Sequence, residues 1–425
     1  AVGAPGRTFT PVPALPPSPL RVLHLPKWYP NRYDDQDGDF VARHVAAIAA
    51  TTTPGQPLQS AVVFAAVARG PLGGLVEEEI DLTGPVPTWR YYYRARPTGL
   101  APLDKLLKLG LWAVCMARGW RAVRRHWQGR RPDIVHAHVL LRTGVWALWL
   151  RWRHRIPYLV TEHWTLYLPD RAAAVGALRK WVSRLVVGRA AALHTVSANL
   201  REAMGARGIV NNQSVVIANV VDTALFRLPN APRVPHRLLV VSAFHDEVKN
   251  ISGILRVVAR RRAAGEPVAL RLAGYGPDEV RLHQHSTELG LLADGTVTFL
   301  GKLPHQAVAQ EMAAATALVS FSRAETFGCV LLEARATGCP VVGPATGGVP
   351  ELFQPPDTFG ILVKPGDESA LYQALDDLLT GRFSYSPVLL RHDAEQRCGY
   401  APVGRQFRQL YAHLLAAPPF PAEGK

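Results

Sequence analysis

The sequence predicts an α/β protein with two doubly wound domains, each built on a parallel sheet. Apolar stretches of strand length alternate with amphipathic helical segments in two successive blocks. Polar or glycine-containing segments follow the strands, which is where ligands bind in sheets of this kind. The proline-rich stretch PNAPRVP lies between the blocks. We therefore expect an N-terminal domain at 20–228, a linker at 229–235 and a C-terminal domain at 236–400.

The residues before the first strand differ in composition from the rest of the chain. Residues 1–19 are rich in proline and lack the basic and apolar regions of a secretory signal, so we expect a disordered lead-in. No apolar run in the 425 residues approaches the length of a membrane span. The four cysteines have no metal-ligand spacing. We therefore expect free thiols, no metal site and a cytoplasmic location.

In the first block, strands and helices alternate with short loops. Strands are expected at 21–25, 61–65, 89–93, 133–138, 158–161, 192–196 and 214–219. Helices are expected at 41–50, 103–127, from 144, at 172–188 and from 198, where Ser197 provides an N-cap. Apart from the strand at 89–93, residues 77–100 are too irregular to assign. The opening order of strand, glycine-bearing loop and helix is that of a βαβ unit.

The second block repeats this alternation. Strands are expected at 238–242, 268–273, 297–300, 317–321 and 340–342, with helices from 250, at 304–314 and from 326. A last helix is expected at 402–416, packed back onto the N-terminal domain. The chain is thus expected to form two α/β units with one helix crossing back between them.

The stretch from Leu318 to Leu352 carries the strongest functional pattern. Glu325 and Glu333 lie on either side of a helix start, and a strand and a glycine-rich turn follow them. Free backbone N–H groups and the helix dipole at such a start favour an anion. Glu333 lies among apolar neighbours in LLEARA, which argues against an ordinary solvated glutamate. At about 1.5 Å per residue the carboxylates span roughly 12 Å, which suits a nucleoside diphosphate sugar.

These residues resemble the motifs of the retaining glycosyltransferases of family 4, which have GT-B architecture. The motifs that carry the resemblance are E-x7-E at 325–333, FG at 327–328, GxPVV at 338–342, GGxPE at 347–351, NVVD at 219–222 and GILV at 360–363. The resemblance extends over nearly the whole chain from about residue 20. It implies two Rossmann-like domains that face each other across a cleft.

The resemblance also implies a role for each matching residue. The family's first glutamate faces the donor sugar and its second holds the ribose hydroxyls, so these roles pass to Glu325 and Glu333. Lys249 matches a phosphate contact, and His138, which ends a strand, matches a histidine that approaches the donor sugar. We expect His136 on the other side of that strand and buried. The diphosphate would meet the backbone near the helix start, at Phe327, Gly328, Cys329 and Val330.

Other candidate residues have weaker patterns. Gly38 resembles a glycine loop over the donor phosphates, and Gly274 is a donor-site candidate that a tight turn also explains. Asp39 follows Gly38, and Glu162 and His163 end another strand. We expect these three near the acceptor, with a structural role for Glu162 and His163 as the alternative.

The sequence departs from the family after the strand at 238–242. The family usually has Gly-Arg there, whereas this chain has Ser242-Ala243, so one positive charge toward the diphosphate is missing. Lys249 would carry more of that role, or Arg323 or His245 would replace the arginine. A non-catalytic nucleotide- or glycan-binding protein therefore stays open as an alternative, as does a sugar phosphorylase or synthase-like enzyme.

The net charge of +15 is confined to the first part of the chain. Residues 1–230 hold 29 Lys and Arg against 14 Asp and Glu, whereas residues 231–425 hold 19 of each. All ten tryptophans also lie in the first part. Basic helices with tryptophan nearby are typical of a surface that meets anionic lipid; the alternative is tryptophan in the core and arginine in water. No nucleic-acid-binding module is evident, so we expect no nucleic-acid partner.

From the sequence we therefore expect a metal-independent, retaining hexosyltransferase that needs no cofactor. Its co-substrate would be a nucleotide-diphosphate sugar, held mostly by the C-terminal domain. The acceptor would be a hydroxyl of a glycan or lipid-linked molecule, held by the N-terminal domain, in polysaccharide or glycolipid synthesis. Peripheral attachment to the inner membrane face is a further expectation.

Overall fold

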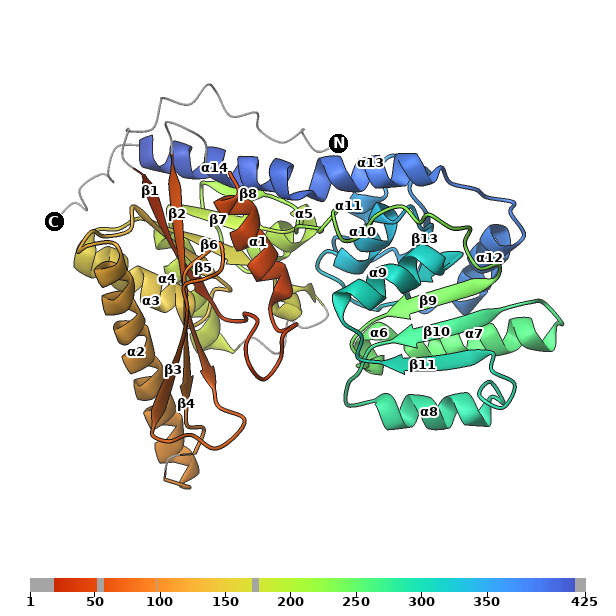
Figure 1. Cartoon of the computed structure of the whole chain (residues 1–425), viewed down its shortest axis with the longest axis horizontal. Helices are drawn as coiled ribbons and strands as arrows, with labels where there is room; N and C mark the ends of the chain where they lie inside the picture. Colours follow the sequence, from red (N-terminus) through yellow and green to blue (C-terminus); the bar gives the residue numbers. More distant parts are fainter. Residues whose placement is uncertain (1–18, 52–56, 97, 170–175, 417–425) are drawn as a thin grey trace.

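A computed structural model describes residues 19–51, 57–96, 98–169 and 176–416. Two lobes lie side by side, each with a central sheet and helices on its faces (Figure 1). The predicted mixed α/β fold with two parallel sheets is confirmed. The expected lead-in lies outside the described residues except for Pro19, and the first four residues of the helix expected at 172–188 also lie outside them.

The N-terminal lobe is built on an eight-stranded sheet with the strand order β3-β4-β2-β1-β5-β6-β7-β8. Its strands are β1 (Leu20–Pro26), β2 (Leu58–Val67), β3 (Val76–Asp81), β4 (Thr88–Tyr93), β5 (Ile134–His138), β6 (Tyr158–Glu162), β7 (Ala192–Thr195) and β8 (Ser214–Val216). Neighbouring strands are parallel except for β3, which pairs antiparallel with β4 at the sheet edge. The sequence left β3 unassigned because none of its residues is buried, so it has no apolar face.

Helices cover this sheet in the expected order. They are α1 (Asp39–Ala49), α2 (Ala101–His126), α3 (Thr143–His154), α4 (Ala177–Arg189) and α5 (Ala198–Gly205), with a short 3-10 turn at Thr165–Tyr167. The predicted cap of α5 is confirmed, because Ser197 Oγ accepts a hydrogen bond from the N–H of Leu200 at 3.2 Å.

The C-terminal lobe has a six-stranded sheet, all parallel, in the order β11-β10-β9-β12-β13-β14. Its strands are β9 (Arg237–Val241), β10 (Ala269–Ala273), β11 (Val297–Gly301), β12 (Ala317–Val319), β13 (Val341–Pro344) and β14 (Ile361–Val363). Its helices are α6 (Asp246–Lys249), α7 (Ile251–Ala263), α8 (Glu279–Glu288), α9 (His305–Ala314), α10 (Cys329–Ala336), α11 (Val349–Leu352) and α12 (Glu368–Leu379).

Two helices at the end of the chain run along both lobes. Helix α13 (Pro387–Cys398) packs against α10, and α14 (Tyr400–Ala416) packs against α1 (Figure 1). Phe407 and Tyr411 of α14 are fully buried under the N-terminal sheet. The last helix therefore contributes to the core of the first lobe, although it follows the second lobe in the sequence.

The strand order places one topological switch point in each sheet. In the first sheet β1 lies between β2 and β5, and in the second sheet β9 lies between β10 and β12. The chain leaves β1 toward one side of the first sheet and leaves β5 toward the other, and β9 and β12 differ in the same way in the second sheet. A crevice forms between the carboxyl ends of two such strands, and ligands of such folds bind there. The segments that follow β1, β5, β9 and β12 hold most of the candidate residues.

Candidate active site

An ion pair lies at the switch point of the C-terminal sheet. Lys249 ends α6, which follows β9, and its Nζ pairs with Oε1 of Glu325, which follows β12. The hydroxyl of Ser322 donates to the same carboxylate oxygen at 3.2 Å. The side chains of Lys249 and Glu325 are 26% and 15% exposed, so the pair is partly buried but open to a ligand. The structure thus joins two residues that are 76 positions apart in the chain.

The glycine-rich turn after β13 fixes the backbone around Glu325. A Cβ atom on Gly347 would overlap the carbonyl oxygen of Glu325, and one on Gly348 would overlap that of Thr326. Gly347 also has φ of +56°, a conformation that L side chains rarely adopt. The N–H of Gly348 donates to the Glu325 carbonyl at 3.3 Å. The two segments therefore pack as one unit, which explains why both glycines accompany the glutamate.

Helix α10 begins three residues later than expected, at Cys329. Gly328 precedes it with φ of +92°, so the backbone at 326–328 is a turn. Phe327 is 4% exposed and packs inward, and burial raises the pKa of the Cys329 thiol to about 12. Among the described residues no side chain caps α10. Its first N–H groups therefore remain for an anion.

Glu333 is held from the other lobe. Its carboxylate, in a residue that is 8% exposed, accepts a charge-assisted hydrogen bond of 2.5 Å from Arg43 of α1. Arg43 also pairs with Asp39 at 2.5 Å. Asp39 lies 3.4 Å from His305 of the C-terminal lobe, so this predicted acceptor residue is at the interface between the lobes. Sequence reasoning missed Arg43, because its partner Glu333 lies 290 residues away and no local pattern marks the contact.

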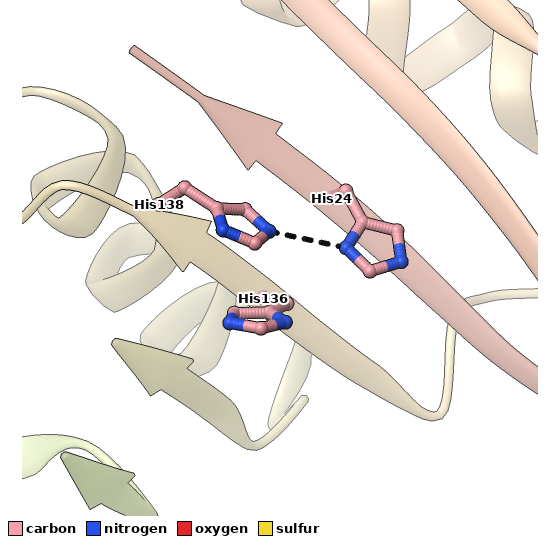
Figure 2. Close-up of side chains that lie close together, drawn as sticks. All are labelled: His24, His136 and His138. Carbon is pink, nitrogen blue, oxygen red and sulfur yellow. Dashed lines mark hydrogen bonds between the residues drawn. The ribbon is translucent and has the colours of Figure 1, made fainter. Parts of the chain in front are cut away.

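His138 ends β5 with its side chain fully buried. Its Nε2 lies 3.2 Å from Nδ1 of His24 on β1, as the dashed line in Figure 2 shows. Burial lowers the pKa of His138 well below its usual value. The expectation that His136 faces the other side was wrong, because residues two apart share a face of a strand, and the two rings stack with centroids 3.9 Å apart.

Glu162 and His163 are also buried. The Glu162 carboxylate accepts hydrogen bonds from the N–H groups of Leu140 at 3.0 Å, His163 at 3.0 Å and Trp164 at 2.9 Å. Burial raises its pKa in spite of these donors. Glu162 therefore holds the ends of β5 and β6 together. The His163 ring is different, because neither of its nitrogens has a hydrogen-bond partner in the described part of the chain.

The remaining candidates have structural contacts. A Cβ on Gly38 would overlap the carbonyl of Trp28, and one on Gly274 would overlap the carbonyl of Ser242, so close packing requires glycine at both positions. Arg323 donates to the side-chain oxygen of Asn250 at 3.0 Å. His245 and Ala243 lie in the loop before α6.

Further contacts between the lobes surround the site. The hydroxyl of Ser197 donates to the carbonyl of Thr326 at 2.8 Å. Glu351 of α11 accepts from the first N–H groups of α5, those of Ala198 at 2.9 Å and Asn199 at 2.8 Å. A carboxylate of one lobe thus caps a helix of the other. Sequence reasoning missed Glu351 as a contact because its partners lie about 150 residues away.

Comparisons with known proteins agree with this architecture. A family model described as "Glycosyl transferase 4-like domain" matches residues 42–220, and one described as "Glycosyl transferases group 1" matches residues 235–381. The chain is 28% identical over 270 residues to an MMP α-(1→4)-mannosyltransferase of Mycolicibacterium hassiacum, covering 59% of this chain and 63% of that protein. It is 29% identical over 346 residues to a 2-deoxystreptamine N-acetyl-D-glucosaminyltransferase of Streptomyces fradiae, covering 72% and 76%.

Solved structures share the fold at lower identity. A sucrose-phosphate synthase of Thermosynechococcus elongatus aligns with a TM-score of 0.71 at 23% identity, covering 94% of this chain and all of that one. HepE of Anabaena, solved with UDP, aligns with a TM-score of 0.67 at 18% identity, covering 93% of this chain and all of that one. The matched segment spans less than two thirds of the mannosyltransferase, and only 30% of a D-inositol 3-phosphate glycosyltransferase of Stackebrandtia nassauensis that is 38% identical.

Proposed function

The chain belongs to the group 1 glycosyltransferases, and we propose that it is a retaining enzyme that transfers a sugar from a nucleotide-diphosphate donor to an acceptor hydroxyl. The observation that carries this proposal is the Lys249–Glu325 pair at the switch point between β9 and β12. The acceptor would be a glycan or a lipid-linked molecule, and the product would belong to a polysaccharide or glycolipid.

In the proposed reaction, the bond from the sugar C1 to the leaving diphosphate is replaced by a bond to the acceptor oxygen with the same configuration. The diphosphate would leave with the electron pair of the broken bond and take up the proton of the acceptor hydroxyl. Negative charge grows on the diphosphate as it leaves. Lys249 would face that charge, and the N–H groups at the start of α10 would share it. Glu325, released from Lys249, would accept a hydrogen bond from a sugar hydroxyl. Glu333 would hold the ribose hydroxyls.

We assign His138 a positioning role instead of a catalytic one. Its ring is fully buried, and its carbonyl accepts from the N–H of Lys27 at 3.2 Å and the hydroxyl of Thr143 at 3.3 Å. These bonds tie the end of β5 to the loop after β1 and to α3. The ring of His138 adds a bond to His24 of β1, so the histidine would shape the cleft beside the sugar without direct contact with the sugar.

The donor is best identified by measuring turnover with a panel of UDP-, GDP- and ADP-sugars, with and without a range of acceptors. HepE was solved with UDP, whereas the curated relatives are named for different sugars and acceptors, so the panel has to be broad. We expect hydrolysis or transfer with one donor class, and a product whose anomeric configuration equals that of the donor. Inversion at C1 would contradict the retaining mechanism, and no turnover with any donor would favour a non-catalytic binding protein.

We also propose that the leaving diphosphate needs no metal ion, because Lys249 and the helix amides supply positive charge. Turnover is expected to persist in EDTA at unchanged donor concentration. A strict requirement for Mg²⁺ or Mn²⁺ would overturn this part of the proposal. A phosphate ion that acts as the acceptor in the same assay would instead indicate a phosphorylase.

A basic and apolar surface on the N-terminal lobe favours attachment to an anionic lipid bilayer. Helices α3 and α4 pack against each other, and Trp152 and Trp181 are 78% and 61% exposed, with Leu178 at 74%. Arg153 and Arg179 are exposed beside them. Of the helices in the described ranges, none is long and apolar enough to cross a bilayer. We propose a peripheral contact at the cytoplasmic face, where tryptophan lies at the headgroup level and arginine meets lipid phosphate.

Co-sedimentation with vesicles tests this contact. We expect binding to vesicles that contain anionic lipid, weaker binding to neutral vesicles, and loss of binding at high salt. A double variant, Trp152→Ser with Trp181→Ser, is expected to lose most of the binding. The control is Val388→Ser, which removes an apolar side chain that is 66% exposed on the other lobe. Binding that ignores lipid charge, salt and the double variant would remove the membrane proposal.

A further inference from the structure

A cluster of buried histidines fills the space between the N-terminal sheet and helices α1 and α14, and only His138 among them has a role, a positioning one, in the proposed function. The residues are His24, His44, His136, His138, His163 and His194. Most of their ring nitrogens have hydrogen-bond partners. Within the described ranges, four have none: Nδ1 of His44, Nδ1 of His138 and both nitrogens of His163.

These four nitrogens need an explanation. A buried polar atom without a partner costs about 1–3 kcal/mol, and one remedy that native proteins use is a bound ion. His44 lies on α1, His138 ends β5, and His163 follows β6. One ring nitrogen of each lies within 4.8 Å of those of the other two. Three separate elements thus bring one ring nitrogen each to one point, and each of these histidines has at least one nitrogen without a partner in the described ranges.

The hydrogen bonds indicate which of these nitrogens carry lone pairs. Nε2 of His44 lies 3.1 Å from the carbonyl oxygen of Ala218, which can only accept, so Nε2 carries the proton. Nε2 of His138 lies 3.2 Å from Nδ1 of His24, and Nε2 of His24 lies 3.3 Å from Oγ of Ser60. Protons on both Nε2 atoms satisfy the two bonds, and so does the reverse arrangement, in which Nδ1 of His24 donates to His138 and the Ser60 hydroxyl donates to His24. The metal site requires the first arrangement. Nδ1 of His44 and Nδ1 of His138 are then lone pairs, and burial keeps the rings neutral.

We propose that His44, His138 and His163 form a binding site for a divalent transition-metal ion of the Zn²⁺ class. Neutral imidazole is a preferred ligand of such ions, and ligating histidines commonly donate their other N–H to a carbonyl or another acceptor, as His44 does here. Tetrahedral ligands at about 2.0–2.1 Å from Zn²⁺ are roughly 3.3 Å apart, so shifts of about 1 Å would close the site. Asn219 is a candidate fourth ligand: its buried side-chain oxygen has no hydrogen bond within 3.5 Å in the described ranges, but its side chain is close enough to His163 to interact with that ring.

A second group of three histidines fits a metal ion less well. His24, His136 and His138 also have nitrogens within 4.8 Å of one another. Figure 2 shows the hydrogen bond between His24 and His138, with His136 next to them. However, both nitrogens of His136 already have partners, Tyr411 at 2.7 Å and Thr161 at 2.5 Å. An ion there would break these bonds, whereas each histidine of the His44 group has at least one nitrogen without a hydrogen-bond partner among the described residues.

An ion at the His44 site would join α1 to the ends of β5 and β6. The adjacent residue on α1 is Arg43, which pairs with Glu333 of the other lobe. The ion would therefore stabilise the helix whose Arg43 contacts the other lobe. The proposal goes beyond the proposed function, and its test needs no donor or acceptor.

Metal binding by the tag-free full chain tests the proposal. After treatment with a chelator, the protein is titrated with Co²⁺, whose visible absorption reports tetrahedral coordination, and then with Zn²⁺. We expect one equivalent of Co²⁺, displacement by Zn²⁺, and a higher Tm of the Zn²⁺-loaded chain. His44→Gln is expected to weaken Co²⁺ binding at least tenfold. His194→Gln is the matched control, because His194 is equally buried but both of its nitrogens have partners.

Two results would overturn the site: wild-type protein that takes up neither ion at micromolar concentration, or His44→Gln that binds Co²⁺ like the control. If His44→Gln does not fold, His163→Gln replaces it, and the Tm shift of wild-type protein on adding Zn²⁺ decides. The absence of a Tm shift would then contradict the proposal. Turnover of the Zn²⁺-free wild-type chain is measured separately, so that failure of the metal site and failure of the glycosyltransferase proposal remain distinguishable.

Discussion

The two lobes place different chemistry at the carboxyl ends of their sheets. The C-terminal lobe presents charged groups, Lys249 and Glu325, whose side chains are 26% and 15% exposed. The N-terminal lobe presents neutral imidazoles, and the rings of His24 and His138 are fully buried. A partly exposed ion pair can exchange one partner for a ligand of the same charge. A buried neutral cluster cannot, so we infer that the first lobe provides shape and the second provides charge.

Acid lability of the N-terminal lobe is the largest effect that this contrast predicts. Burial lowers the pKa of His24 and His194 to about 3 and that of His44 to about 4, against about 6.5 in the unfolded chain. The unfolded chain therefore binds more protons below pH 6.5. Stability from the neutral rings is complete above pH 6.5 and is lost as the pH falls toward the folded pKa values of about 3 to 4. Each ring can remove up to about 1.4 kcal/mol per pH unit, so the three together can remove up to about 4 kcal/mol per pH unit.

Thermal unfolding between pH 8 and pH 5 measures this loss. We expect a steep fall in Tm below pH 6.5, and a shallower fall in His194→Gln, which lacks one of the titrating rings. His392→Gln serves as the control because His392 is exposed. A Tm that stays level down to pH 5 would show that the first lobe does not depend on neutral imidazoles.

The ion pair of the C-terminal lobe predicts the second-largest effect, a loss of turnover. Lys249→Ala and Glu325→Gln are each expected to lower kcat about 10²- to 10³-fold, the range found when one group that stabilises a transition state is removed. Tm should change little, because a partly exposed ion pair contributes at most about 1 kcal/mol. Arg256→Ala is the control, since it removes an exposed pair with Glu368 elsewhere in the same lobe. Near-normal rates in both site variants would remove the assignment.

Glycine substitutions test whether the backbone around Glu325 is equally important. Gly347→Ala would place a Cβ in the carbonyl oxygen of Glu325 and displace its turn. We expect kcat to fall about 100-fold, because displacement of a reacting group by about 1 Å can have that effect. Gly295→Ala is the matched control. Both glycines have positive φ, +56° and +73°, but nothing lies within 4 Å of a Cβ at Gly295. Equal losses in both variants would indicate backbone strain alone.

The sequence predicts more of the charged site in the C-terminal lobe than of the buried histidine cluster in the N-terminal lobe, for a physical reason. The alternation of apolar segments predicts both sheets, and a glutamate beside a helix start and a glycine turn has a local pattern. The pairs that join the lobes have none: Arg43 and Glu333 are 290 residues apart. The buried histidines likewise come from separate strands and helices, so no spacing along the chain brings them together. Strand β3 was not predicted because none of its residues is buried, so its sequence has no apolar face.

The Arg43–Glu333 contact between the two lobes predicts the smallest effect. Arg43→Met would leave the Glu333 carboxylate without its partner from α1, so the glutamate would be less well oriented toward the ribose. We expect the KM for the donor to rise up to about tenfold, equivalent to about 1.4 kcal/mol, with a smaller change in kcat. Arg32→Met is the matched control, because it removes an Arg–Glu pair, with Glu77, that lies within the first lobe. If both variants raise KM equally, the bridge has no special role; if Arg43→Met lowers kcat alone, Arg43 acts on the chemical step and the division between a shaping lobe and a charged lobe fails.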